Sequence, residues 1–333
     1  MTKSIKEKTA PKKESIFLKK GFREGLNGFI FIAPFLAGVI IFQLYVFISG
    51  FYLSMTDASG LNHPNFIGIA NYQRLWNEFF SQGEFWKAAL YTFEYEAGCL
   101  LTQVPVAFVL AFVLNSLPYK TLQGVLRTCF FVPCIVNAII VGWIFSQLFN
   151  PEQGTINWVL GLLGLMKENP VTHLLKPIDW VNNSDLVILM LIIISFWQWM
   201  GYHMVYFVSQ LQTIDPNLYE AAKIDGATNS QIIMRITLPL MRPAVSFVTI
   251  TSLVGGFLLF DLIFIVYGGA GVGMFGPGDH AKLFVPYIYY YAFDKSPTQI
   301  GLASAAGWMV FFLIAVINII QIRVLGLGSA KEE

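Results

Sequence analysis

The decisive stretch of this sequence reads EAAKIDGA at residues 220–227, followed by ITLP at residues 236–239. It is a short polar interruption in a chain of 333 residues that is 56% hydrophobic and only 12% charged. Soluble domains usually carry about 25% charged residues, and a soluble fold of this size could not bury so much apolar surface. We therefore expect an all-α integral membrane protein in which this stretch lies outside the bilayer, where another polypeptide can bind it.

Working outward from this stretch, six windows are apolar and long enough to cross a bilayer, which requires about 20 residues. The expected spans are residues 28–55, 89–117, 125–149, 184–212, 240–267 and 299–325. With the N-terminus inside, most of the 21 Lys and Arg residues flank the inner ends of these spans. Because positive charge favours the cytoplasmic side, we predict six transmembrane helices with both termini cytoplasmic.

The spans divide the chain into a basic cytoplasmic segment (1–27), a six-helix membrane domain (28–325) and a cytoplasmic tail (326–333). The apolar run after the basic segment is too long for a signal-peptide core, so the first span is expected to be uncleaved. Residues 213–239 form the main cytoplasmic loop. Four tryptophans lie in the outer segments and are expected in the aromatic belt at the membrane interface: Trp76, Trp86, Trp158 and Trp180.

Helix signals predict two short helices in the cytoplasmic loop. Asp215 can cap the first helix, residues 216–225, and Pro suits its first position. Gly226 can end it, because glycine adopts the left-handed conformation at low cost. Asn229 or Ser230 could cap a second short helix, which the proline of ITLP would end.

The first loop helix carries small apolar side chains, which would let the backbone of a partner protein approach closely. Acidic groups beside that surface could set the register of docking by charge. An amphipathic helix lying on its own membrane domain is the alternative, but the spacing of Glu-Ala-Ala, glycine and Ile-x-Leu-Pro favours docking. The predicted docking residues are Glu220, Ala221, Ala222, Asp225 and Gly226.

This loop resembles the EAA loop of permease subunits in ATP-driven, binding-protein-dependent importers. Other elements resemble, in the same order, those of sugar permeases of the maltose-transporter F-subunit type. They are FIGIANY at 66–72, RTCFFVP at 127–133, NPEQGTIN at 150–157, FD at 260–261, GG at 268–269 and YIYYYAF at 287–293. The likeness covers roughly residues 28 to 325, and it departs from the family at GGA (268–270), where GGP is usual, and in the glycine-rich stretch 268–278.

The resemblance implies a type I ABC importer transmembrane domain in a bacterial or archaeal inner membrane. Such a permease pairs with a second permease, two ATPase subunits and an extracytoplasmic solute-binding protein, and alternates between outward-open and inward-open states. ATP and Mg²⁺ would bind to the ATPase, because this sequence has no G-x-x-x-x-G-K-[ST] motif. No cofactor, metal site or enzyme activity is expected in this chain, whose four histidines show no ligand spacing.

A substrate path is predicted on two spans, each with polar, aromatic or small residues at positions i, i+3, i+4 and i+7. The predicted residues are Ser195, Gln198, Trp199 and Tyr202 on the fourth span and Ser252, Gly255, Gly256 and Leu259 on the fifth. Aromatic faces with neutral polar groups suit a sugar, and the resemblance places the sugar site of maltose-type permeases at these positions. Ordinary helix packing is the alternative, and the second permease could hold the site instead.

Ionisable residues within spans are costly in lipid and point to function by default. Glu94 and Glu96 fall near the outer end of the second span, where we expect water to reach them. Asp261 belongs to the Phe-Asp element and favours internal structure as much as transport. His203 is expected to be a packed, hydrogen-bonded side chain and not a proton relay.

Three other functions compete with that of a carbohydrate importer permease. A self-contained secondary transporter or channel would be expected to show inverted repeats and buried ion-coupling charges, and neither is visible in the sequence. A membrane-embedded glycan or lipid transferase would carry clustered acids or histidines, which this sequence lacks. An ABC importer permease for a non-sugar solute would share every feature described above, because selectivity in such systems rests largely with the binding protein. The leading hypothesis is the permease of an oligosaccharide or carbohydrate importer, with the particular carbohydrate undetermined.

Overall fold

The structure is a computed structural model that describes residues 14–60, 63–166, 176–268 and 273–324. Within these ranges the chain is helical, without a strand, and one isolated bridge joins Thr56 and Phe66. Five helices of the described chain are long and apolar enough to cross a membrane, and one bent helix pair makes a sixth candidate. The prediction of an all-α membrane protein is therefore confirmed.

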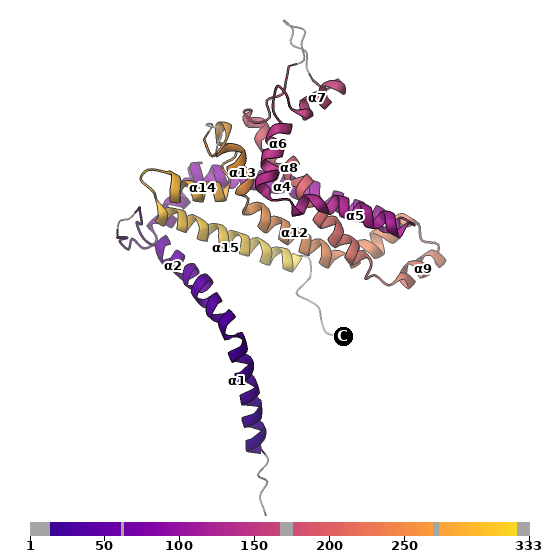
Figure 1. Ribbon diagram of the computed structural model, residues 1–333, viewed down its shortest axis with the longest axis horizontal. Coiled ribbons are helices and arrows are strands. Elements are labelled where there is room, and N and C mark those ends of the chain that lie inside the picture. The colour runs from indigo at the N-terminus through magenta and orange to yellow at the C-terminus, as the bar shows by residue number, and fades with distance from the viewer. Residues whose placement is uncertain (1–13, 61–62, 167–175, 269–272, 325–333) are drawn as a thin grey trace, which may run out of the picture. The chain divides into compact units, whose positions relative to one another are not determined.

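Residues 1–53 form the first of two units. Helix α1 (Glu14–Val39) continues through a π-helical turn, η1 (Ile40–Leu44), into α2 (Tyr45–Ser54) (Figure 1). Large apolar side chains along this run, such as Phe31 and Phe42, are exposed. A helix that exposes apolar side chains along most of its length fits contact with lipid. The helix also begins well before residue 28, where the sequence placed the start of the first span.

Residues 54–333 form the second unit. Its helices are α3 (Ala70–Phe80), α4 (Glu84–Ser116), α5 (Lys120–Ile135), α6 (Ala138–Leu148), α7 (Thr155–Leu162), α8 (Ser184–Leu211), α9 (Pro216–Ile224), α10 (Asn229–Ile232), η2 (Ile233–Thr237), α11 (Leu238–Leu240), α12 (Arg242–Phe257), α13 (Asp261–Tyr267), η3 (Pro277–Asp279), α14 (Phe284–Tyr289), η4 (Tyr290–Asp294) and α15 (Ile300–Val324). The long helix α4 packs against α3, α5, α8, α12 and α14.

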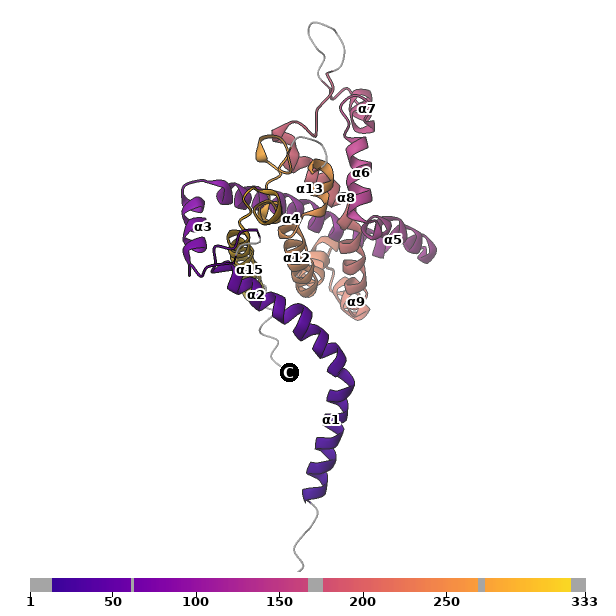
Figure 2. The same cartoon turned by 60° about the vertical axis from the view of Figure 1, so that its left-hand side comes forward.

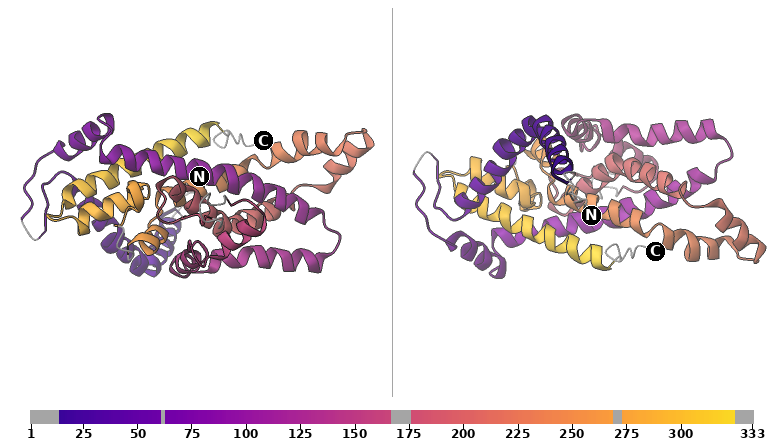
Figure 3. Two further views of the ribbon diagram at one scale, coloured as in Figure 1. Left: turned by 90° about the horizontal axis from the view of Figure 1, so that it is seen from above. Right: turned by 90° about the horizontal axis from the view of Figure 1, so that it is seen from below.

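Two connections of the second unit lie at the same end of it. Figure 2 shows α3 on the side opposite α5 and α9. In both views of Figure 3, the connection between α4 and α5 and the segment around α9 lie at the same end. The connection between α4 and α5 therefore shares one end of the unit with the predicted cytoplasmic loop at residues 213–239.

The third predicted span, residues 125–149, is not one straight helix. It consists of α5 and α6, which meet at an angle of 97°. Pro133 lacks the N–H that would continue the helical hydrogen bonds, and α5 ends two residues later. The side chain of Asn137 then caps α6 by accepting a hydrogen bond of 2.9 Å from the backbone N–H of Ile139. Proline and cap together turn one expected span into a bent pair.

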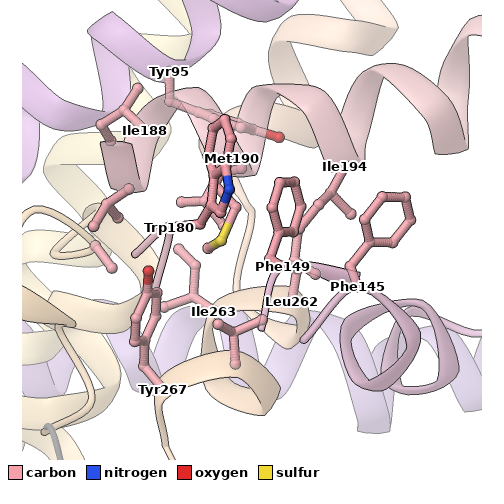
Figure 4. Close-up of a cluster of buried hydrophobic side chains, with 14 of the residues drawn as sticks. Tyr95, Phe145, Phe149, Trp180, Ile188, Met190, Ile194, Leu262, Ile263 and Tyr267 are labelled. Atoms are coloured by element: carbon pink, nitrogen blue, oxygen red, sulfur yellow. The ribbon is translucent and has the colours of Figure 1, made fainter. Parts of the chain in front are cut away.

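One of the apolar cores fills the space between α4, α6, α8 and α13 (Figure 4). Trp180 lies in this core and is only 8% exposed. The expectation that it belongs to an interfacial belt is therefore wrong. Its indole N–H donates a hydrogen bond of 3.0 Å to the side-chain oxygen of Asn157, so the ring packs against Phe149 while its polar atom is satisfied.

Asn157 also holds the loop that carries Trp180. Its Nδ2 donates hydrogen bonds of 3.0 Å to the Pro151 carbonyl and 2.8 Å to the Ile178 carbonyl. At Gly154 an added Cβ would overlap the carbonyl of Asn150. The NPEQGTIN element is thus a hydrogen-bonded junction that joins α6, α7 and the segment before α8.

A buried lysine organises the segment before α14. The Lys282 ammonium group donates to Asp279 Oδ2 at 2.8 Å and also pairs with Glu84 at the start of α4. Burial lowers the pKa of Lys282, but the two hydrogen bonds with carboxylates outweigh it and the pKa is raised. These ion pairs tie residues 279–282 to α4. Residues 269–272 of the glycine-rich stretch lie outside the described residues.

Candidate functional site

The cytoplasmic loop contains the predicted first short helix. The Asp215 side chain accepts a hydrogen bond of 2.9 Å from the backbone N–H of Asn217, and Pro216 occupies the first position of α9. The helix ends at Ile224, and Gly226 has a φ of 75°, in the left-handed region. Sequence rules therefore placed this helix correctly to within a residue.

The second short helix differs from the prediction at both ends. Its cap is Thr228, not Asn229 or Ser230, and it forms a reciprocal capping box with Gln231. The proline of ITLP does not end the element, because α10, η2 and α11 follow one another as far as Leu240, and α12 begins at Arg242. The loop therefore leads almost directly into the fifth span.

The predicted docking surface is accessible. Glu220, Ala221, Asp225 and Gly226 are exposed, and Ala222 is half-buried. Ile224 on the same helix is 86% exposed. Figure 1 shows α9 at an end of the second unit. These residues are accessible to another protein, and that a partner docks on them stays a prediction.

Helix α9 also contacts η2, the second element after it. The Tyr219 hydroxyl lies 3.4 Å from the Thr237 hydroxyl, and Thr237 is fully buried in η2.

A cavity of about 490 Å³ lies among α4, α8, α12 and α13. Seven of the eight predicted path residues line it: Gln198, Trp199, Tyr202, Ser252, Gly255, Gly256 and Leu259. The structure thus brings the predicted faces of the fourth and fifth spans together around one space. That a substrate occupies this space stays a prediction.

Two of the predicted path residues have structural partners. Ser195 is not part of the lining; its hydroxyl and that of Tyr95 are joined by a hydrogen bond of 2.6 Å between α8 and α4. Gln198 lines the cavity, but its Nε2 donates a hydrogen bond of 3.2 Å to the Val136 carbonyl at the break between α5 and α6. The polar face of α8 therefore serves helix packing as well as the cavity.

Sequence reasoning missed the contribution of α4. Tyr95, Glu96, Cys99 and Gln103 line the cavity. Glu96, Cys99 and Gln103 stand at positions i, i+3 and i+7, the helical spacing that identified the other two faces. That periodicity was the available signal, but the uniform hydropathy of the surrounding span obscured it.

Glu96 contradicts the expectation that water reaches it. Glu94 is exposed, whereas Glu96 is only 3% exposed. Neither carboxylate oxygen of Glu96 has a hydrogen-bond partner among the described residues. Across the cavity wall, a Cβ added at Gly256 would overlap Glu96 Oε2, so this glycine provides the room that the carboxyl group occupies.

His203 and Asp261 also line the cavity. His203 is packed as predicted, at 3% exposed, but its Nδ1 lacks a hydrogen-bond partner among the described residues. Asp261 is exposed and begins α13. Two acidic groups and one imidazole therefore accompany the aromatic and neutral polar side chains of this space.

Comparison with known proteins identifies the family of this chain. Residues 103–325 match the family model described as a binding-protein-dependent transport system inner membrane component. A lactose transport system permease protein of Rhizobium radiobacter is 30% identical over 89% of this chain and 93% of its own length. An arabinooligosaccharide transport system permease protein of Bacillus subtilis (strain 168) is 29% identical over 92% of this chain and 90% of its own.

A solved structure shares the fold. One chain of a bacterial ABC transporter involved in the import of the acidic polysaccharide alginate superimposes with a TM-score of 0.76. It is 22% identical, and the match covers 94% of this chain and 99% of that one.

Proposed function

Because this chain belongs to the family of binding-protein-dependent transport system inner membrane components, we propose that it forms the path of an ATP-driven importer for an oligosaccharide or related carbohydrate. It is a multi-pass membrane protein and a transport permease subunit. The names of its relatives, which include permeases for lactose and for arabinooligosaccharides, support the carbohydrate class.

The observation that carries the proposal is the cavity among α4, α8, α12 and α13. Its volume of about 490 Å³ falls within the range of about 300–1,000 Å³ that is usual for small-molecule sites. Trp199 and Tyr202 offer aromatic faces, and Gln103 and Ser252 offer neutral polar groups. Sugars present both apolar faces and hydroxyl groups, so this lining suits them.

The transport step proposed for the chain involves no covalent chemistry. The partners are a second permease, two ATPase subunits and an extracytoplasmic binding protein, and ATP and Mg²⁺ bind on the ATPase. Closure of the ATPase dimer pushes on α9, and the contact between Tyr219 and Thr237 helps to pass that movement to α12. Since α12 lines the cavity, its movement changes the access of the cavity to either side.

The experiment is transport by the assembled importer in proteoliposomes. Glu220→Ala and Gly226→Val are each compared with Glu152→Ala, a change of an exposed acidic residue away from the loop. We expect each loop variant to lower ATP-driven uptake at least tenfold while the chain still inserts and purifies, and Glu152→Ala to transport like the wild type. Full-rate uptake by both loop variants, or purification of the chain without any ATPase, would refute the proposal.

A further inference from the structure

We propose that the groove between α3 and α15 holds a glycerolipid of the outer leaflet, with α3 lying in the membrane interface. The groove is separate from the cavity among α4, α8, α12 and α13, so the proposal does not depend on which solute the importer carries. The ligand class is a lipid with ester groups and long acyl chains, bound without selection for the charge of its headgroup.

The first observation is the face that α3 exposes. Leu75 is fully buried, whereas the next residue, Trp76, is 58% exposed and Phe80 is 66% exposed. Ile69, just before the helix, is exposed as well, and at seven positions before Trp76 it falls on the same side. An apolar strip beside polar positions is typical of a helix that lies in the interface of a bilayer.

The second observation is a cluster of aromatic rings where α3 meets α4. Trp76 packs edge-to-face on Phe80, with ring centroids 5.0 Å apart, and Phe79 packs in the same way on Trp86 of α4 at 4.8 Å. Figures 2 and 3 show α3 on the side opposite α9, which is the predicted outer side. Tryptophans concentrate at this level of a membrane because the ring is apolar and its N–H is polar.

The third observation is a groove beside this strip. It has a volume of about 560 Å³ and is lined by Tyr72, Gln73, Trp76 and Asn77 of α3 and by Met309 of α15. Gln73 and Asn77 are exposed, and their side-chain amides can donate hydrogen bonds to ester and phosphodiester oxygens. Trp76 and Met309 offer apolar surface to methylene groups. The groove therefore suits both the polar and the apolar part of a glycerolipid.

The fourth observation is that the groove continues into the membrane-facing side of α15. This helix is long and apolar enough to cross a membrane. The exposed residues at i+3, i+7 and i+11 from Met309, on the same side of α15, are Phe312, Val316 and Ile320. Met309 itself lies nine positions after Ile300, where α15 begins, which is about 14 Å along the helix axis. That depth falls within the outer half of a hydrocarbon core of about 30 Å, so an acyl chain can run from the groove along α15.

The charges around the groove give no reason to select an anionic headgroup. Among its described residues the lining has no charged side chain. The guanidinium group of the neighbouring Arg74 is engaged elsewhere, because its Nε pairs with Glu78 at 3.1 Å and its Nη1 donates to Gln299 at 3.0 Å. We therefore expect phosphatidylethanolamine and phosphatidylglycerol to bind alike.

The first test locates Trp76 in the assembled importer, reconstituted in phosphatidylcholine vesicles. Its fluorescence is the difference between the wild type and Trp76→Phe. Brominated phosphatidylcholine quenches rings that contact acyl chains, and acrylamide quenches rings that contact water. We expect the brominated lipid to quench Trp76 by about half or more, as it would any interfacial ring. Trp180, measured in the same way with Trp180→Phe, is the control and should be quenched little, because it is 8% exposed and lies in a protein core.

The second test counts the lipids that the importer retains, by native mass spectrometry after extraction from vesicles of phosphatidylethanolamine or phosphatidylglycerol. The double variant Gln73→Ala/Asn77→Ala should bind the groove lipid roughly tenfold more weakly, as the loss of two hydrogen bonds predicts, and so retain one lipid fewer than the wild type. Asn182→Ala removes an exposed amide elsewhere on the predicted outer side and should retain as many lipids as the wild type.

Quenching of Trp76 by acrylamide but not by brominated lipid would overturn the proposal, because α3 would then face water. Quenching by neither reagent would also overturn it, because another protein, such as a second permease, would then cover the strip. Equal lipid retention by the wild type and the double variant would show that the groove holds no lipid. None of these measurements involves a saccharide, so the proposal and the proposed function can fail separately.

Discussion

Replacement of Asn157 tests whether the NPEQGTIN element is structural. The side chain makes three hydrogen bonds, to the Pro151 carbonyl at 3.0 Å, to the Ile178 carbonyl at 2.8 Å and from the Trp180 indole at 3.0 Å. A buried hydrogen bond contributes about 1 kcal/mol to the free energy of unfolding. Asn157→Ala should therefore destabilise the protein by about 3 kcal/mol, and by more if the buried Trp180 N–H stays unpaired.

Asn157→Asp separates the hydrogen bonds from the volume of the side chain. The aspartate can still accept from Trp180, but it loses both donors and places a carboxylate oxygen against two carbonyl groups. We expect a loss of stability at least as large as that of Asn157→Ala. A cavity-filling role alone would predict the reverse, with Asn157→Asp close to the wild type.

The assay is denaturant unfolding of the purified full-length chain in detergent micelles, followed by far-UV circular dichroism and tryptophan fluorescence. Asn182→Ala is the matched control, because Asn182 is exposed and its side chain donates to Asp179 of its own loop, at 3.1 and 3.2 Å. We expect this control to stay within about 0.5 kcal/mol of the wild type, as surface substitutions do. If Asn157→Ala has the same free energy of unfolding as the control, the reasoning is refuted.

Two further predictions concern packing and pH. A Cβ at Gly201 would overlap the backbone carbonyl of Phe130, whereas a Cβ at Gly307 meets no atom within 4 Å. Gly201→Ala should therefore lower the free energy of unfolding by about 1–3 kcal/mol through overpacking, and Gly307→Ala should leave it unchanged or raise it. Thermal unfolding of the two variants measures the difference. The raised pKa of Lys282 means that its ion pairs stabilise the fold below the usual lysine pKa of about 10.4 and lose this effect as the pH rises through the higher pKa of the folded state. The difference in melting temperature between the wild type and Lys282→Met should therefore be constant from about pH 7 to 9 and shrink above about pH 10.5, and a difference that grows with alkaline pH would contradict this account.

Much of the architecture follows from local composition. The spans could be located because lipid requires about 20 apolar residues in a row, wherever the helix lies in the bundle. The loop helix α9 could be placed because its cap, Asp215, and its terminating Gly226 act within a few residues of the backbone that they satisfy. The two path faces on the fourth and fifth spans could be found because helical spacing puts their residues on one side.

The remaining features depend on contacts between distant segments. Trp180 resembles an interfacial tryptophan in the sequence, and it is buried because Asn157, 23 positions earlier, accepts its N–H. The burial of Glu96 depends on a glycine of α12 lying opposite it, 160 positions later in the chain. Composition and periodicity act over one helical turn or one bilayer thickness. The sequence by itself therefore determined the spans, the loop helix and the helix faces, which depend on nothing more distant. Which polar side chains lose their water, and which of them face a shared cavity, depended on how α4, α8 and α12 pack, and only the tertiary structure decided it.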